Sequence, residues 1–370
     1  MLVATFFQER SEKMSDRQKE EIEVFMCENC GGNMVFDIKS QALKCPYCET
    51  EVAIDHEGEV HEYDFSNVST LEEKSNWNED VEVITCESCG AETVVDKHIT
   101  ALHCSYCGSS HVLKTKQSAG IKPEAILPFK IEKHQAMEEL SKWVKYRWLA
   151  PNDLKLLYQS DKLQAVYVPY WTYDANTSST YTARGGRYYY ETREINGKKE
   201  QVQKVRWYPV SGHLHQFFDD ILVNASHHYS DTIMCGVEPF NTDRVEPYRS
   251  EYISGYMAER YSLSVQEGFT FAKQKINREL EEAARLEVLR YYDTVSGIHV
   301  QTHYDHVTFK HVLLPIWTAT YDYKGKQYQY IINGETGRIH GTYPYSWVKI
   351  TILIILGIIA IYFIFVYFNS

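Results

Sequence analysis

The chain has 370 residues, 44% of them hydrophobic and 14% aromatic, which suffices for one substantial core plus a smaller unit and excludes a disordered tether. Its formal net charge of −12 is unevenly spread, because the stretch from Glu21 to Gln117 holds nineteen Asp and Glu against six Lys. So acidic a region repels phosphate backbones, which argues against nucleic-acid binding by this part of the chain.

The first residues lack the pattern of a signal peptide. Met1 to Arg10 contains few apolar residues, and Glu12 to Glu23 is charged, whereas a signal peptide needs an apolar core of about 7–15 residues. We expect an N-terminal tail over 1–21, with Met1 and Met14 both open as the start.

Eight of the nine cysteines fall into two sets of four that share one spacing. Each set has two C-x-x-C pairs separated by fourteen residues, and the second set repeats the first at an offset of 59 residues. The two sets are Cys27, Cys30, Cys45 and Cys48, then Cys86, Cys89, Cys104 and Cys107. The repeat predicts two small units of one fold.

Paired C-x-x-C motifs of this kind are typical of zinc ribbons. Two residues between thiolates let one tight turn direct both sulfurs at a metal about 2.3 Å away, and a second turn completes the tetrahedron. Gly31 and Gly90 follow the leading pairs, where the backbone is expected to need a positive φ. The sequence predicts two structural zinc ions, with iron left open because it fits the same thiolates.

A redox role is the competing interpretation of Cys45-Pro-Tyr-Cys48, which resembles the motif of glutaredoxins. A redox pair is expected to begin a helix after a strand, whereas this one has a partner pair upstream and a second copy downstream. A disulfide framework is disfavoured, because the cytosol keeps thiols reduced.

Charge decides what the ribbons are expected to bind. Four ionised sulfurs give each zinc site about two negative charges, and the region lacks basic patches with interleaved aromatic residues. We expect the ribbons to dock proteins or to serve as scaffold. Nucleic-acid binding would need a basic groove on the body, between Ala119 and Tyr345.

After an acidic linker over Asp55 to Asp80, helix and strand patterns appear. Apolar spacing predicts helices from Lys133 to Leu149, ended by Pro151, and from Val265 to Arg290. Their inner faces are expected to hold Ala136, Leu140, Trp143, Val144 and Trp148, then Phe269, Ala272, Ile276, Leu280, Ala283 and Leu286. Alternating aromatic sequence predicts antiparallel strands at 165–173, 180–190, 201–208, 312–321, 327–332 and 338–343, with turns at Asn196-Gly197 and Asn333-Gly334.

A fainter repeat relates the two halves of this body. Val168-Pro-Tyr-Trp-Thr172 and Leu314-Pro-Ile-Trp-Thr318 lie 146 residues apart, and each follows a predicted helix and precedes a hairpin. We expect an internal duplication of a helix-plus-sheet unit, with the two prolines at edges or bulges.

The stretch from Ile350 to Phe368 is predicted to span a membrane. It has nineteen residues without a charge, fourteen of them Ile, Leu, Val or Phe, and as a helix it reaches about 28 Å, close to the hydrocarbon thickness of a bilayer. Lys349 and Arg338 precede it and no cation follows, so the positive-inside tendency places the preceding bulk in the cytoplasm. We expect a tail-anchored, single-pass protein of the cell membrane.

The predicted fold class is α+β, with two small four-cysteine zinc ribbons, an antiparallel-sheet-plus-helix body and one C-terminal transmembrane helix. The expected boundaries are 1–21 for the tail, 22–54 for zinc ribbon 1, 55–80 for the acidic linker, 81–117 for zinc ribbon 2, 118–348 for the body and 349–370 for the anchor.

From about Val24 onward, the paired ribbons, the terminal apolar segment and several short motifs carry a family resemblance. The motifs are Trp143 to Pro151, Phe218-Asp-Asp-Ile-Leu222, Pro247-Tyr248, Ser254-Gly-Tyr256, Leu313-Leu-Pro-Ile-Trp317, Ile332-Asn-Gly-Glu-Thr-Gly337 and Pro344-Tyr-Ser346. The chain resembles a bacterial family labelled TFIIB-type zinc ribbon-containing protein, or named after the primosomal replication-factor-Y helicase. Some members sit beside phage-shock A and SPFH-type membrane-stress proteins, so the resemblance implies a role in cell-envelope maintenance with such proteins as partners.

The helicase name finds no support in the residues, because the chain has no G-x-x-x-x-G-K-[ST] loop to hold nucleotide phosphates. An enzymatic role rests on one segment with side chains that suit a hydrolytic metal: His213, His215, Asp219, Asp220, His227 and His228. That segment lacks the motif H-E-x-x-H. A metal-dependent hydrolase that uses this segment is the alternative function to the one predicted below. The predicted function is a membrane-anchored, cytosol-facing adaptor or scaffold, not an enzyme, that binds protein partners in the envelope stress response.

Overall fold

The computed structural model describes residues 25–74, 82–86, 91–95, 112–115, 120–151, 163–195 and 198–369. Within these ranges thirteen strands form one mixed sheet, three short strands form a separate sheet, and helices pack on the large sheet. The α+β class is confirmed, together with an apolar C-terminal helix of membrane-spanning length.

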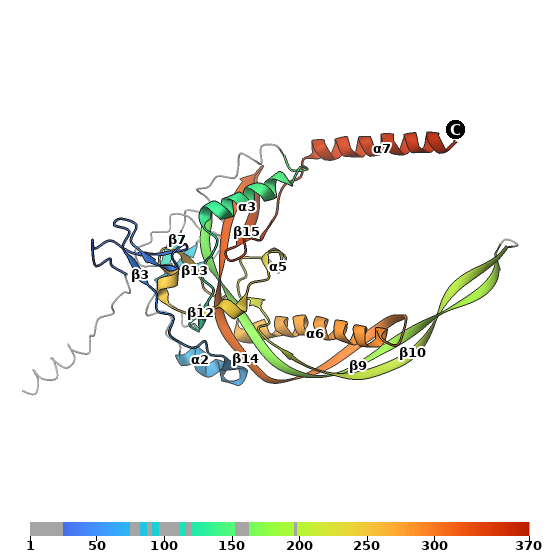
Figure 1. Ribbon diagram of the computed structural model, residues 1–370, viewed down its shortest axis with the longest axis horizontal. Coiled ribbons are helices and arrows are strands. Elements are labelled where there is room, and N and C mark those ends of the chain that lie inside the picture. Colours follow the sequence, from blue (N-terminus) through green and yellow to red (C-terminus); the bar gives the residue numbers. More distant parts are fainter. Residues whose placement is uncertain are drawn as a thin grey trace, which may run out of the picture.

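Three long strands dominate the large sheet (Figure 1): β9 (Gln164–Ile195), β10 (Lys198–Phe218) and β14 (Thr294–Tyr323). β9 pairs antiparallel with β10 along one edge and with β14 along the other. The strands predicted at 165–173 and 180–190 are parts of β9, because Asn176 to Ser179 between them are paired with both β10 and β14.

Burial along β9 changes in three steps. Residues from Val166 to Ala175 are buried on both faces, and the following residues up to Ala183 alternate between buried and exposed. β14 pairs with β9 only as far as Gly186, beyond which the described side chains of β9 are exposed. The end of the β9–β10 hairpin therefore extends past the body as a two-stranded arm (Figure 1).

The helix α6 (Val265–Leu289) covers the alternating face of this sheet. A capping box fixes its start, since the hydroxyl of Ser264 accepts from the Glu267 amide at 3.3 Å and the Glu267 carboxylate accepts from the Ser264 amide at 3.0 Å. Side chains along one stripe of the helix are buried: Val265, Phe269, Ala272, Ile276, Leu280, Ala284 and Val288. Leu286, predicted on the inner face, is exposed, because the buried stripe follows the row of residues four apart.

Two tryptophans make equivalent hydrogen bonds in the two halves of the body. The Trp171 indole N–H donates to the carbonyl of Leu263 at 2.8 Å, directly before the N-cap of α6. The Trp317 indole N–H donates at 2.8 Å to the carbonyl of Ile131, directly before the N-cap of α3 (Lys133–Lys145). Trp171 of β9 thus contacts the start of α6, the helix that precedes β14. Trp317 of β14 contacts the start of α3, the helix that precedes β9. Reciprocal contacts of this kind are expected of a duplicated unit.

The prolines of the two repeated motifs lie inside the β9–β14 ladder, where the first residues of both motifs face each other. The carbonyl of Pro169 accepts from the Ala225 amide at 3.0 Å, and that of Pro315 accepts from the Gly334 amide at 2.9 Å. Since N–H and C=O of one strand residue point the same way, both missing N–H groups face away from the ladder, toward the ends of shorter strands. Of the two expected alternatives, an edge or a bulge, the bulge is wrong for both prolines, because the register shifts of this ladder lie elsewhere.

The inner face predicted for the first helix is confirmed for four of its five residues, since Ala136, Leu140, Trp143 and Val144 are buried in α3. The helix ends at Lys145 rather than at Leu149, and Trp148 is exposed. Shorter elements complete the body: β8 (Ala125–Ile126), β11 (Val223–Asn224), α5 (Asp231–Val237), η3 (Thr242–Arg244), β12 (Glu246–Pro247), η4 (Ser250–Ile253), β13 (Met257–Glu259), β15 (Lys326–Asn333) and β16 (Ile339–Gly341).

The segment predicted as an acidic linker is packed against the body over its described residues 55–74. Its elements are β4 (Tyr63–Asp64), η1 (Phe65–Asn67) and α2 (Val68–Lys74). β4 pairs with β14, Val68 is buried, and the Tyr63 hydroxyl donates to the carboxylate of Glu124 at 2.7 Å. Apolar residues between the acidic ones supply contacts that the average composition of the segment hides.

The ribbon sequences form short sheets that join the body. In ribbon 1 the strands are β1 (Val35–Asp37), β2 (Ala42–Lys44) and β3 (Glu51–Ala53); in the second ribbon region they are β5 (Glu82–Cys86), β6 (Glu92–Val95) and β7 (Val112–Thr115). β6 pairs with β13 and so belongs to the large sheet. Ribbon 1 docks through Ser254, whose hydroxyl donates to the Met34 carbonyl at 2.8 Å and whose carbonyl accepts from the Phe36 amide at 3.0 Å.

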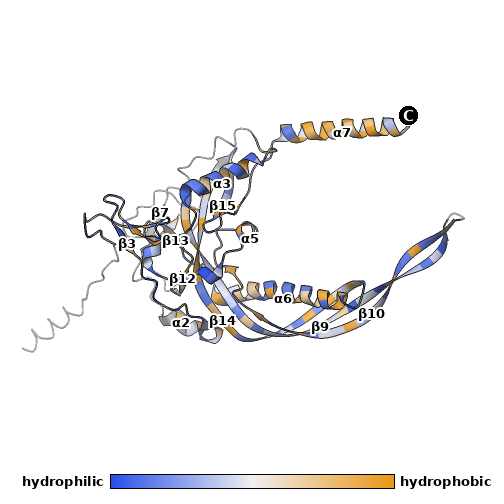
Figure 2. Ribbon diagram, in the orientation of Figure 1, coloured by the Kyte–Doolittle hydropathy of each residue, from blue (hydrophilic) through white to orange (hydrophobic). Residues whose placement is uncertain are grey.

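The C-terminal helix α7 (Trp347–Asn369) leaves the body as an isolated rod, at the opposite end of the molecule from ribbon 1 (Figure 1). An 18-residue window within Trp347–Phe368 has a mean hydropathy of 2.9, and most of the α7 ribbon after its first turn carries the hydrophobic colour (Figure 2). Its first turn is fixed to the loop after α3, because the Lys349 ammonium donates to the carbonyls of Trp148 at 2.9 Å and Ala150 at 2.6 Å.

Candidate metal centre

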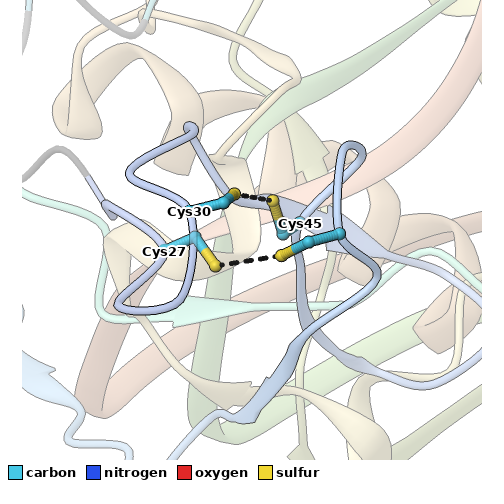
Figure 3. Close-up of side chains that lie close together, drawn as sticks. Cys27, Cys30 and Cys45 are labelled. Carbon is cyan, nitrogen blue, oxygen red and sulfur yellow. Dashed lines mark hydrogen bonds between the residues drawn. The ribbon is translucent and has the colours of Figure 1, made fainter.

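Four cysteines of ribbon 1 converge on one point (Figure 3). The sulfur atoms of Cys27 and Cys48 lie 3.4 Å apart, as do those of Cys30 and Cys45, and all four sulfurs lie within 4.8 Å of one another. Sulfurs at the corners of a tetrahedron with Zn–S bonds of about 2.3 Å would be about 3.8 Å apart. The arrangement therefore has the size of a four-thiolate metal site.

The first pair of cysteines is held by a tight backbone turn. The Gly31 amide donates to the Cys27 carbonyl at 2.8 Å, and the Cys27 amide donates to the Gly32 carbonyl at the same distance. Gly31 has φ of +74°, which confirms the expectation that this position needs a left-handed backbone.

The second pair of cysteines repeats this geometry. The Glu49 amide donates to the Cys45 carbonyl and the Cys45 amide to the Thr50 carbonyl, both at 2.9 Å, and Glu49 has φ of +61°. Two turns of the same shape thus direct four sulfurs inward. A redox pair is expected to begin a helix, and neither turn does so.

The thiol chemistry of this group favours a cation. The Thr50 hydroxyl and amide lower the pKa of Cys48 to about 5. The amide of Gly32 alone would lower the pKa of Cys30, but the adjoining thiols of Cys48 and Cys45 raise it to about 12. Four sulfurs in one small site cannot all ionise without a positive charge between them, and a divalent metal supplies that charge.

The second cysteine set is described only in part. Cys86 is buried at the end of β5, and its amide donates to the Ala91 carbonyl at 2.9 Å, five residues on, as the Cys27 amide donates to the Gly32 carbonyl in ribbon 1. Cys89, Cys104 and Cys107 lie outside the described residues, as does Gly90, so the prediction of a second site is carried by the sequence repeat.

Within the described chain, one further group of potential metal ligands lies within 4.8 Å: Glu62, Asp174 and Asp220. The Lys310 ammonium already lies among these carboxylates, at 2.8 Å from Glu62 and 2.7 Å from Asp220. The Asp174 carboxylate accepts from the Asp220 amide at 2.7 Å. This acidic cluster joins four distant parts of the chain, and its own lysine occupies the place that a cation would take.

Burial and mutual interaction shift the pKa values in the acidic cluster. Burial, then the neighbouring Glu62, raise the pKa of Asp174 to about 7. The hydrogen bond with Asp174 lowers the pKa of Glu62 to about 2 against the effect of burial, and Lys310 adds to that lowering. Burial alone would lower the pKa of Lys310, but its bonds to Asp220 and Glu62 raise it to about 12.

The histidines of the segment His213 to His228 belong to neither ligand group. His213 and His215 are exposed on β10, whereas the imidazole of His228 lies 2.7 Å from the buried carboxylate of Glu259. Of the residues considered for a hydrolytic metal, Asp220 alone enters one of the groups, and its nearest partner there is Lys310.

Comparisons with known proteins add a relative without an assigned activity. No family model matches the chain, and no solved structure matches it. The chain is 26% identical over 333 residues to "Uncharacterized protein YdjG" of Bacillus subtilis (strain 168), which covers 88% of this chain and 91% of that protein. The similarity extends over nearly the whole length of both chains.

The four-cysteine group predicts a measurable loss of metal on substitution. In the full chain, purified reduced in detergent, Cys45→Ser is expected to lose one metal equivalent, because an alcohol replaces a buried thiolate ligand. Elemental analysis by mass spectrometry gives the stoichiometry. Cys235→Ser is the matched control, since Cys235 lies outside the group, and equal metal content in both variants would contradict the site.

The acidic cluster predicts how stability depends on pH. The folded chain holds a proton on the Asp174 carboxyl up to about pH 7, whereas the unfolded chain releases it near pH 4. The free energy of unfolding therefore falls, through Asp174, as pH rises from about 4 to 7. The difference in unfolding temperature between Asp174→Asn and the unaltered chain is therefore expected to be more positive at pH 8 than at pH 5.5. Thermal unfolding across this range tests it, with exposed Asp219→Asn as control; the same pH slope in Asp174→Asn and the unaltered chain would refute it.

Proposed function

We propose that this protein is a membrane-anchored adaptor or scaffold whose zinc ribbons face the cytosol and bind protein partners. The observation that supports it most is the placement of the four-cysteine group and of α7 at opposite ends of one body (Figure 1). A protein arranged in this way presents a ribbon surface away from the membrane that holds it.

The chemistry of the cysteine group supports a structural rather than a catalytic metal. Four thiolates leave no open coordination position, and Cys27 and Cys45 are buried. We propose zinc as the ion, in two equivalents per chain, because the spacing of the first set recurs in the second.

The surface of ribbon 1 has features that suit protein docking. Tyr47 is 79% exposed beside the metal ligand Cys48, and Met26 is 57% exposed beside Cys27. The exposed carboxylates of Glu28 and Glu49 lie in the same two turns. An aromatic anchor within an acidic rim favours a partner with a complementary basic surface.

The orientation and the cellular role are also part of the proposal. Lys349 and the lysines of the β14–β15 turn lie at the start of α7, and cations on this side favour a cytoplasmic body. The resemblance to the bacterial double-ribbon family leads us to propose membrane-stress proteins as the partners.

Truncation tests the anchor. A chain ending at Lys349 is expected to move from the membrane fraction to the soluble fraction, because it loses the apolar part of α7 and keeps the lysine contacts that end the body. Fractionation and immunoblotting measure this. Protease added outside intact cells is expected to leave the body whole, and cleavage of the ribbons from outside would contradict the cytosolic orientation.

Affinity capture tests the partner. The full zinc-loaded chain, solubilised from membranes, is expected to retain a protein that is lost with Tyr47→Ala or Glu28→Lys, and to retain less of it at high salt, because charge attraction is screened beyond ~8 Å at physiological ionic strength. Glu279→Lys, an equal charge change on the exposed face of α6, is the control. Capture that is the same with all three variants, or binding of DNA or RNA at physiological salt, would disprove the adaptor role.

A further inference from the structure

A groove lies at the junction between the body and α7. It has a volume of about 850 Å³ and is lined by the β14–β15 turn, by the loop after α3 and by the first residues of α7. Three lysines line it, Lys324, Lys326 and Lys349, with aromatic side chains that include Tyr328 and Trp347. None of the described lining residues is Asp or Glu.

Two of the lysines are placed by a tight turn. Lys324 has φ of +54° and Gly325 has φ of +74°, which is the backbone of a two-residue hairpin turn with both central residues left-handed. Tyr323 and Lys326 form the closing pair of the β14–β15 ladder. Lys324 and Lys326 are both exposed, so the ladder presents two ammonium groups at one fixed point of the rim.

The third lysine connects the groove to the anchor. Lys349 lies in the first turn of α7 and donates to carbonyls of the loop after α3, which fixes the helix start against the body. Trp347 is 81% exposed and Tyr345 is 55% exposed at the same level. Exposed Trp and Tyr at the end of a spanning helix lie at the depth of lipid headgroups.

We propose that this groove binds the phosphate group of an anionic phospholipid, with the acyl chains lying along α7. Three lysines line the groove and its described lining residues include no carboxylate, a charge that matches a negative headgroup; basic pockets between spanning helices on the cytoplasmic side bind such groups. The groove opens where the apolar surface of α7 begins, so one ligand with a charged head and apolar tails satisfies both surfaces. The inference rests on the anchoring part of the proposed function and is independent of the partner at the ribbons.

The test is a lipid titration of the full chain in a non-ionic detergent, followed by native mass spectrometry. Phosphatidylglycerol is expected to bind saturably and at least tenfold more tightly than phosphatidylcholine with the same acyl chains. Each lysine near an anionic group is worth roughly a fivefold change in affinity, so Lys324→Gln with Lys326→Gln is expected to weaken phosphatidylglycerol binding about 30-fold. Replacing the same two lysines by Arg is expected to retain it.

Matched controls separate this site from general charge and from free phosphate. Lys39→Gln with Lys133→Gln removes two exposed lysines elsewhere and is expected to leave the affinity unchanged. Glycerol phosphate, which lacks acyl chains, is expected not to compete. Equal binding of the two lipids, equal losses in both double variants, or full competition by glycerol phosphate would overturn the proposal. The detergent titration requires neither membrane insertion nor a partner at the ribbons. Its failure is therefore distinguishable from a failure of the anchoring test or of the affinity capture.

Discussion

The antiparallel ladder between β9 and β14 is the constraint on which the rest of the body depends. Where this ladder is buried on both faces, Trp171 and Trp317 each donate one indole hydrogen bond to the residue before a helix N-cap. The ring of Phe129, three residues before one N-cap, meets Trp317 at 5.4 Å, and the ring of Tyr261, three residues before the other, meets Trp171 at 4.8 Å. A buried indole N–H without a partner is costly, so each tryptophan fixes a helix as well as filling the core. Two equivalent contacts of this kind set both helices relative to one sheet.

The metal centre depends on the same body. Cys27 and Cys45 belong to one buried cluster with Trp143 of α3 and Tyr252 of η4, and the ring of Phe36 meets the edge of Tyr252 at 5.4 Å. About thirty residues of ribbon cannot bury enough apolar surface to fold alone, so ribbon 1 depends on its packing against the body, and a metal held by the four thiolates would add to that stability. Ribbon 1 is therefore packed on the body rather than joined to it by a loose tether, and with α7 anchored as proposed, a partner bound there would be held at a defined distance from the membrane.

Local patterns predicted the parts of this structure that local chemistry determines. The left-handed Gly31, the inner face of α3 and the apolar helix α7 follow from spacing and composition over fewer than twenty-five residues. The acidic cluster could not be predicted in this way, because Asp174 of β9, Lys310 of β14 and Glu62, which directly precedes β4, are brought together only by the sheet. The same reason applies to the segment after ribbon 1, where the average charge indicated a linker although its few apolar residues pack on β14. The resemblance of the two tryptophan motifs was visible in the sequence, but the crossed contacts that explain it required the register of β9 against β14.

The distribution of charge over the body would affect its tilt at the surface of the proposed membrane. Acidic side chains gather on ribbon 1 and the segment after it, where Glu28, Asp55 and Glu59 are exposed, whereas Lys324 and Lys326 lie beside the start of α7. An anionic lipid surface attracts the second group and repels the first, but both effects fade beyond a Debye length of ~8 Å. The attraction would therefore act continuously on the lysines, which the proposed anchor keeps at the headgroups. The repulsion acts only when the body tilts far enough to bring the ribbon near the lipid. With α7 anchored as proposed, the two effects oppose tilt of the body and keep the exposed Tyr47 on the side away from the lipid.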